Sequence, residues 1–116
     1  MDKLQITAAA DTRCSVVAAT GEIDMASIQS LAQAVARTLS ADRPLVLDLT
    51  GIEFIDSSGL WFLLKTHRDA TALGTTLAIA TSPALDRVLH LAELTDHLPT
   101  HPDRASAEAA CAAPGG

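Results

Sequence analysis

The stretch Ile52-Glu53-Phe54-Ile55-Asp56-Ser57-Ser58-Gly59-Leu60 decides the fold. It follows a short apolar run, residues 45–49, which is bounded by Pro44 and Gly51 and is typical of a buried strand. An amphipathic segment follows it and indicates a helix that extends to Leu73. The Asp-Ser-Ser sequence is therefore predicted to lie at a strand-to-helix turn. There, carboxylate and hydroxyl oxygens accept hydrogen bonds from the first N–H groups of the helix.

Outward from this turn, short apolar runs alternate with amphipathic segments, which predicts an α/β fold with a small mixed β-sheet and packed helices. Two runs at 4–8 and 14–19, joined by a turn at 10–13, predict an N-terminal antiparallel hairpin. Pro99 confines a run at 97–100 to a sheet edge. The remaining expected elements are strands at 45–49 and 75–80, and helices at 25–39, 57–73 (starting at Ser57 or Ser58), 82–94 and 103–112.

The sequence also predicts where helices begin and end and which of their faces are buried. Asp24 is expected to cap the first helix, Ser82 with Pro83 to begin the third, and Gly74 to end the second. The apolar positions recur at helical spacing, so one face of each helix is expected to be buried. The predicted core comprises Leu47, Leu49, Leu63, Leu64, Val88 and Leu89, flanked by Ile28, Leu31, Ala32, Val35, Leu39, Leu60, His67, Leu85 and Ala92.

Size and composition set the class of protein. The 116 residues fit one domain, 1–116, with a core over about 4–110 and a frayed tail over 111–116. The 48% hydrophobic content argues against disorder. No apolar run approaches the ~18 residues of a membrane span, and no secretory h-region follows Met1, so we expect a cytoplasmic protein without a membrane contact.

Charge and ligand chemistry exclude several function classes. Eight Lys and Arg residues against 14 Asp and Glu give a net charge of −6, the reverse of a nucleic-acid-binding surface. The acidity favours solubility, or else attraction to a basic protein partner. Cys14 is expected in the core and Cys111 in the tail, and two cysteines make no disulfide framework. The four histidines are scattered, so we expect no metal and no cofactor.

Trp61, Lys65 and Arg68 recur at i, i+4 and i+7, on a face of the second helix different from its apolar one. This spacing places the single tryptophan beside two cations. Trp61 is then either a residue that packs against the helix flank or an exposed contact residue, and the sequence favours neither.

Three segments resemble one known family. Phe54-Ile55-Asp56-Ser57-Ser58-Gly59-Leu60 is similar to the phosphorylation loop of anti-sigma factor antagonists, the bacterial members of the STAS superfamily. Segments 21–24 (Gly-Glu-Ile-Asp) and 82–94 resemble the same family in the same order, so the resemblance covers roughly residues 4–110. Two positions depart from it: members usually carry a small residue at the place of Trp61, and commonly Gly at the place of Glu93.

The resemblance implies a function and a set of roles. Ser57 would be the phosphoacceptor, and Asp24, Asp56, Ser58 and Gly59 would shape or line the partner surface, with Gly59 allowing close approach of the kinase. Trp61, as an exposed contact residue, would extend that surface. The unphosphorylated protein would bind an anti-sigma factor with serine kinase activity and so release a sigma factor. Phosphorylation would end binding, and a serine phosphatase would restore it.

Other readings of the serines stay open on the sequence. Without the resemblance, Ser57 and Ser58 are ordinary helix caps more often than modification sites. A STAS module that is never phosphorylated and serves as an interaction scaffold is the main alternative. A serine hydrolase is a weaker one, because the Gly-x-Ser-x-Gly pattern is missing, and we expect no enzymatic activity.

Overall fold

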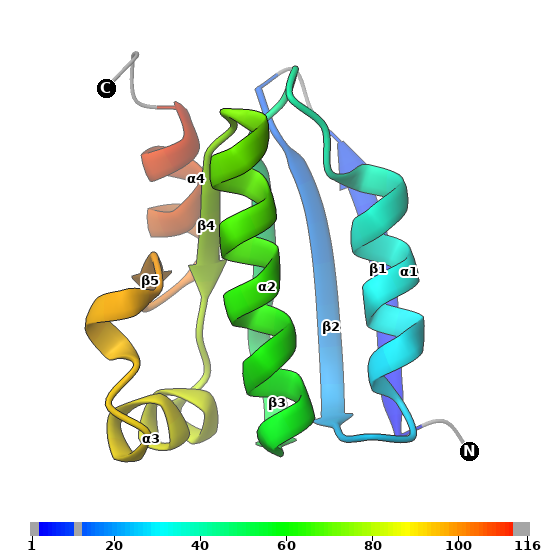
Figure 1. Ribbon diagram of the computed structural model, residues 1–116, viewed down its shortest axis with the longest axis vertical. Helices are drawn as coiled ribbons and strands as arrows, with labels where there is room; N and C mark the ends of the chain where they lie inside the picture. Colours follow the sequence, from blue (N-terminus) through cyan, green and yellow to red (C-terminus); the bar gives the residue numbers. More distant parts are fainter. Residues whose placement is uncertain (1–2, 11–12, 113–116) are drawn as a thin grey trace.

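A five-stranded mixed sheet runs through the computed structural model, which describes residues 3–10 and 13–112 (Figure 1). The strand order is β1-β2-β3-β4-β5; β1 pairs antiparallel with β2, and the other neighbouring strands pair in parallel. The predicted hairpin and mixed sheet are thus confirmed, although residues 11–12 of the predicted turn lie outside the described part. The strands are β1 (Leu4–Ala10), β2 (Ser15–Ile23), β3 (Leu45–Ile55), β4 (Leu77–Ala80) and β5 (Thr100–His101).

The helices lie on both faces of this sheet, as Figure 1 shows. Helices α1 and α2 cover one face, α3 packs its apolar side into the same core, and α4 covers part of the opposite face behind β4. No helix among the described residues is both long and apolar enough to cross a membrane. The helices are α1 (Ile28–Thr38), α2 (Ser57–Leu73), α3 (Pro83–Leu91) and α4 (Arg104–Ala112), with a short 3-10 helix η1 (Thr95–His97).

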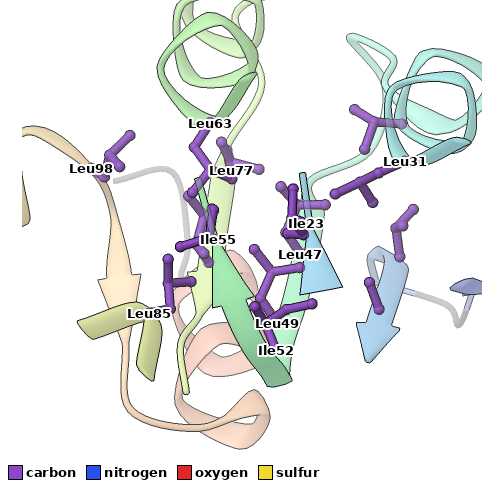
Figure 2. Packing of buried hydrophobic residues seen from close by; sticks show 14 of the residues in the cluster. Ile23, Leu31, Leu47, Leu49, Ile52, Ile55, Leu63, Leu77, Leu85 and Leu98 are labelled. Atoms are coloured by element: carbon purple, nitrogen blue, oxygen red, sulfur yellow. The ribbon is translucent and has the colours of Figure 1, made fainter. Parts of the chain in front are cut away.

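Most apolar side chains meet between the sheet and helices α1, α2 and α3 (Figure 2). Four of the predicted core residues are fully buried: Leu47, Leu49, Leu63 and Leu89. Leu64 and Val88 are only partly buried at the rim of this core, so their burial is less than predicted, and the predicted burial of Ala92 is wrong because Ala92 is exposed. Only a narrow face, centred on Leu63 in α2 and on Leu85 and Leu89 in α3, is fully buried, and Ala92 lies beyond the end of α3 at Leu91.

A second, smaller core lies beneath α4 and contains both cysteines. Cys14 is buried as predicted, but the placement of Cys111 in a frayed tail is wrong, because Cys111 lies in α4 and is 8% exposed. Its Sγ faces the Leu45 carbonyl oxygen at 3.7 Å. Burial, with smaller effects from Cys14 and Glu108, raises the pKa of the Cys111 thiol to about 11, so the thiol stays protonated at neutral pH.

Strand β3 is longer than the sequence predicts, because two bulges carry it beyond Leu49. Its pairing with β2 runs from Ser15↔Leu45 to Ile23↔Ile55, so eight residue steps of β2 (15 to 23) match ten of β3 (45 to 55). Because of the two extra residues, every third side chain faces inward in this part of β3, where a regular strand would turn every second one inward. Leu49, Ile52 and Ile55 therefore all enter the main core, and β3 ends directly at Asp56.

The start of α1 also differs from the prediction. Helix α1 begins at Ile28, and residues 25–27 form a turn. The carboxylate of Asp24 accepts hydrogen bonds from the N–H groups of Ala26 and Ser27, both at 3.0 Å. Asp24 therefore caps this turn and not the helix itself, because its side chain can serve the nearest N–H groups before the chain becomes helical.

The predicted starts of the next two helices are confirmed, whereas α3 ends at Leu91 and not at the predicted residue 94. Asp56 caps α2, whose first residue is Ser57, and Ser82 Oγ accepts the Leu85 N–H at 3.0 Å, with Pro83 in the first turn of α3. The predicted edge strand forms at Thr100–His101, displaced by η1, and pairs with β4.

Two helices end in the same backbone motif with different residues at its left-handed position. After α2, Gly74 (φ 76°) holds that position, and Thr75 N–H donates to the Ala70 carbonyl at 3.0 Å. After α3, Glu93 (φ 59°) holds it, and Leu94 N–H donates to the Leu89 carbonyl at 2.8 Å. This is the Schellman arrangement, for which glycine is the preferred residue. Glu93 therefore keeps a backbone conformation that is unfavourable for a residue with a Cβ atom.

Glu93→Gly is expected to raise the free energy of unfolding by about 0.5–1 kcal/mol, because glycine removes the left-handed strain and the Glu93 side chain forms no ion pair with a described residue. Gly74→Ala is the matched reverse variant: a Cβ there meets nothing within 4 Å, so its expected loss of about 1 kcal/mol comes from the backbone angle alone. Urea unfolding measures both. Equal stability of Glu93→Gly and wild type, with Gly74→Ala destabilised, would contradict the assignment of strain to Glu93.

Candidate functional site

The carboxylate of Asp56 joins two turns of the chain. Its Oδ1 accepts the N–H groups of Ser58 at 3.0 Å and Gly59 at 3.3 Å, at the start of α2. Its Oδ2 accepts the N–H of Met25 at 3.2 Å, in the turn before α1. The backbone adds a further link, since Asp56 N–H donates to the Ile23 carbonyl at 3.1 Å. The end of β2 and the end of β3 are thereby held together beside the first turn of α2.

The neighbouring turn is held by Asp24. Besides the N–H groups of Ala26 and Ser27, the Asp24 carboxylate contacts Lys3 Nζ at 3.3 Å, and Asp24 N–H donates to Ser27 Oγ at 2.9 Å. Partial burial alone would raise the pKa of Asp24, but the hydrogen bonds from Lys3 and Ser27 outweigh it and lower the pKa below 3.8. Asp24 is therefore ionised at neutral pH, and it lies on the segment that Asp56 holds through Met25.

The two adjacent serines have different surroundings. The Ser58 hydroxyl is partly buried and donates to Asp56 Oδ1 at 2.5 Å. Ser57 is exposed at the first position of α2, and its hydroxyl makes no hydrogen bond to any described residue. Ser57 therefore presents a free hydroxyl to solvent, whereas the Ser58 hydroxyl belongs to the capping network of the helix.

Gly59 has a different role from the one predicted. It is buried on the sheet side of α2, and a Cβ atom there would lie 2.5 Å from Ile55 Cγ1 and 2.8 Å from Ile23 Cγ2. Both distances are shorter than real Cβ contacts, so the missing side chain makes room for the chain's own core. Gly59 was expected to allow close approach of a kinase. In the structure it allows α2 to pack closely against the ends of β2 and β3.

Exposed apolar side chains lie on the segments next to Ser57. Trp61, one helical turn after Ser57, is 72% exposed, which settles its open alternative in favour of an exposed residue. Met25 (79% exposed), whose N–H donates to Asp56, lies in the turn before α1, and Phe54 (49% exposed) lies near the end of β3, two residues before Asp56. The sequence analysis did not predict that these two side chains are exposed. It placed Met25 in the first helix and treated Phe54 only as part of the family motif. No signal in the sequence indicates their exposure, because Met25 continues the helical spacing of Ile28 and Phe54 follows Ile52 at strand spacing.

Acidic residues gather at the same end of the molecule. Glu22, Asp24, Glu53 and Asp56 lie at the ends of β2 and β3, and only the Lys3–Asp24 ion pair is found there within the described residues. The site thus combines a free serine hydroxyl, exposed apolar side chains and negative charge. Residues 5–107 match the family model described as STAS domain.

The chain belongs to the STAS domain family. This STAS domain superposes with a TM-score of 0.84 on the crystal structure of an anti-sigma factor antagonist from Mycobacterium paratuberculosis, at 29% identity over 93% of each chain. The unphosphorylated form of the anti-sigma factor antagonist SpoIIAA shares the fold, with a TM-score of 0.67 and 16% identity over 91% of this chain and 96% of that one. The family and fold resemblance predicted from the three sequence segments is confirmed.

A curated relative extends the comparison to a longer protein. This STAS domain is 32% identical over 81 residues to Osmosensory protein A of Mycobacterium tuberculosis (strain ATCC 25618 / H37Rv). The aligned part is 70% of this chain and 51% of that protein, so the match spans about half the length of the relative.

We expect the contribution of Asp56 to stability to depend on pH. The Ser58 hydroxyl, the strongest influence, acts with the N–H groups of Gly59, Ser58 and Met25 to hold the pKa of Asp56 below 3.8. The folded pKa is lower than the unfolded one, so the ionised carboxylate favours folding above pH 3.8, and this contribution disappears as the pH falls through the folded value. Asp56→Asn should therefore be less stable than wild type at neutral pH, by a difference that shrinks below about pH 3.8.

Urea unfolding of both proteins between about pH 7 and about pH 3 measures this difference. Asp42→Asn is the control, since its carboxylate accepts no hydrogen bond from a described residue. A destabilisation by Asp56→Asn that stays constant over the whole range would contradict a charge-dependent cap.

Proposed function

We propose that this protein is an anti-sigma factor antagonist that is switched by phosphorylation of Ser57. In its unphosphorylated form it binds an anti-sigma factor with serine kinase activity and so releases a sigma factor. The kinase then phosphorylates Ser57 and the complex dissociates, and a serine phosphatase restores the binding form. The protein acts as one domain in the cytoplasm and carries out no chemistry of its own.

The observation that carries this proposal is the contrast between the two serines. A kinase needs a hydroxyl that can leave its neighbours and approach the transferred phosphoryl group in line. Ser57 meets this need, because it is exposed and makes no hydrogen bond to a described residue, while Ser58 is held by Asp56. The 29% identical anti-sigma factor antagonist supports the partner class, since it matches over 93% of each chain.

The charge of the site explains how a phosphate would end binding. A phosphate group on Ser57 adds about −1.5 to −2 charges at neutral pH. The same end of the molecule already carries Glu22, Asp24, Glu53 and Asp56. If a partner carboxylate lies ~6 Å away, each unit of charge costs ~2.8 kcal/mol at an effective dielectric constant of ~20, on the order of a hundredfold in affinity. The phosphate also needs space within the contact. The fold of the domain need not change, because a negative group at the start of α2 is favoured by the helix dipole.

Incubation of the purified chain with anti-sigma factor kinases of its own organism and ATP, followed by mass mapping, tests the proposal. We expect one phosphate, on Ser57. Ser58→Ala should still be phosphorylated, because its hydroxyl serves the cap. Ser57→Ala should remain folded, bind the kinase and take up no phosphate. Ser57→Asp should bind more weakly than wild type, though less weakly than the phosphorylated form, because aspartate carries less charge and fewer oxygens.

Two results would contradict the switch. Phosphate on Ser58 alone would mean that the hydrogen bond to Asp56 does not protect that hydroxyl. The second result is a kinase that binds the chain with ATP in its site and transfers no phosphate. This protein would then be an interaction scaffold that is never phosphorylated.

A further inference from the structure

The outward face of α2 carries a continuous stripe of side chains that begins at the free serine. Ser57, Trp61, Leu64, Lys65 and Arg68 follow at i, i+4, i+7, i+8 and i+11, the spacing of one helical face. This face lies opposite the buried residues of the same helix, Gly59, Leu63, Thr66 and Ala70. Eleven residue steps of ~1.5 Å place Arg68 ~16 Å along the helix axis from Ser57.

The far part of this stripe is hollowed. Trp61, Leu64, Lys65 and Arg68 line a surface hollow of ≈ 340 Å³, which we call the α2 groove. Its walls combine the exposed indole of Trp61, the half-buried side chain of Leu64 and the aliphatic stems of two cationic residues. This lining suits an apolar side chain that lies against the indole and a negatively charged group that reaches the cations.

The positive charges of the α2 groove are only partly paired by acidic side chains of the described residues. Lys65 pairs with Asp69 at 2.8 Å, but Arg68 has no ion pair within residues 3–10 and 13–112. The groove is therefore a positive patch on a protein whose net charge is −6. A guanidinium group beside an aromatic ring is well suited to a carboxylate, which it can hold with two hydrogen bonds.

We propose that the α2 groove is a specificity site, which binds an acidic segment of the anti-sigma factor that approaches Ser57. This segment places a carboxylate on Arg68 and an apolar side chain on Trp61. The inference rests on the proposed function and adds to it the chemistry of the partner. Because Ser57 and the groove share one face of one rigid helix, a partner that engages the groove is positioned along α2 with its kinase site over the hydroxyl. Opposite charges at the groove would select one anti-sigma factor among several.

Binding of the purified anti-sigma factor kinase that recognises wild type, measured by calorimetry, tests this assignment. Arg68→Glu should weaken binding by about tenfold or more, because an attraction becomes a repulsion. Trp61→Ala should weaken it by roughly thirtyfold if the indole is a central anchor. The affinity of wild type should fall more steeply between about 50 and about 300 mM NaCl than that of Arg68→Glu.

Arg37→Glu is the matched control. Arg37 lies in the last turn of α1 and lines a hollow with Ala8, Ala9 and Ala10 of β1, away from the α2 groove. It carries the same charge change and should bind the kinase like wild type. Circular dichroism and urea unfolding confirm that each variant is folded.

Each remaining outcome overturns a distinct statement. Wild-type affinity and phosphorylation in both Arg68→Glu and Trp61→Ala would overturn the groove assignment and leave the proposed function intact. Self-association of the isolated chain that Arg68→Glu abolishes would assign the groove to a second copy and overturn the proposal. Failure of every anti-sigma factor kinase to bind wild type would overturn the proposed function, and the inference with it.

Discussion

One carboxylate, that of Asp56, holds together the end of this STAS domain that carries the candidate site. It accepts N–H groups from two separate turns, Ser58 and Gly59 at the start of α2 and Met25 before α1. Two parallel strands end side by side there, and their following turns would otherwise leave unpaired N–H groups. The same carboxylate takes up the Ser58 hydroxyl, which leaves the Ser57 hydroxyl exposed. The network that caps α2 therefore holds the Ser58 hydroxyl and does not include that of Ser57, the proposed phosphoacceptor.

The order of elements was predictable because it depends on local signals. Ser82 with Pro83, Gly74 and Asp56 marked helix ends, and each has the predicted capping role. The long β3 was not predictable, since its bulges are defined by pairing with β2 and break the alternation that reveals a strand. Cys111 was misplaced for a similar reason: its burial depends on where α4 packs against the sheet, which an alanine-rich segment does not reveal.

The candidate site was predictable in its residues but not in their roles. The resemblance pointed to Asp24, Asp56, Ser57 and Ser58, and the fold brings these together through Asp56 and Met25. It could not distinguish the free hydroxyl of Ser57 from the bonded one of Ser58, because that depends on side-chain geometry. The resemblance assigned Gly59 to the partner surface, although a side chain at this position would collide with Ile55 and Ile23. Packing against the protein's own core is invisible in a linear motif.

Amide hydrogen exchange, followed residue by residue by NMR in wild type and Asp56→Ala, tests the joint role of Asp56 most directly. If one carboxylate holds both turns, the N–H groups of Met25 and Ser58 lose protection together in the variant. The N–H of Leu85, which Ser82 caps at the start of α3, stays as protected as in wild type. Loss of protection at Ser58 with Met25 unchanged would contradict the account, because it would confine Asp56 to an ordinary helix cap.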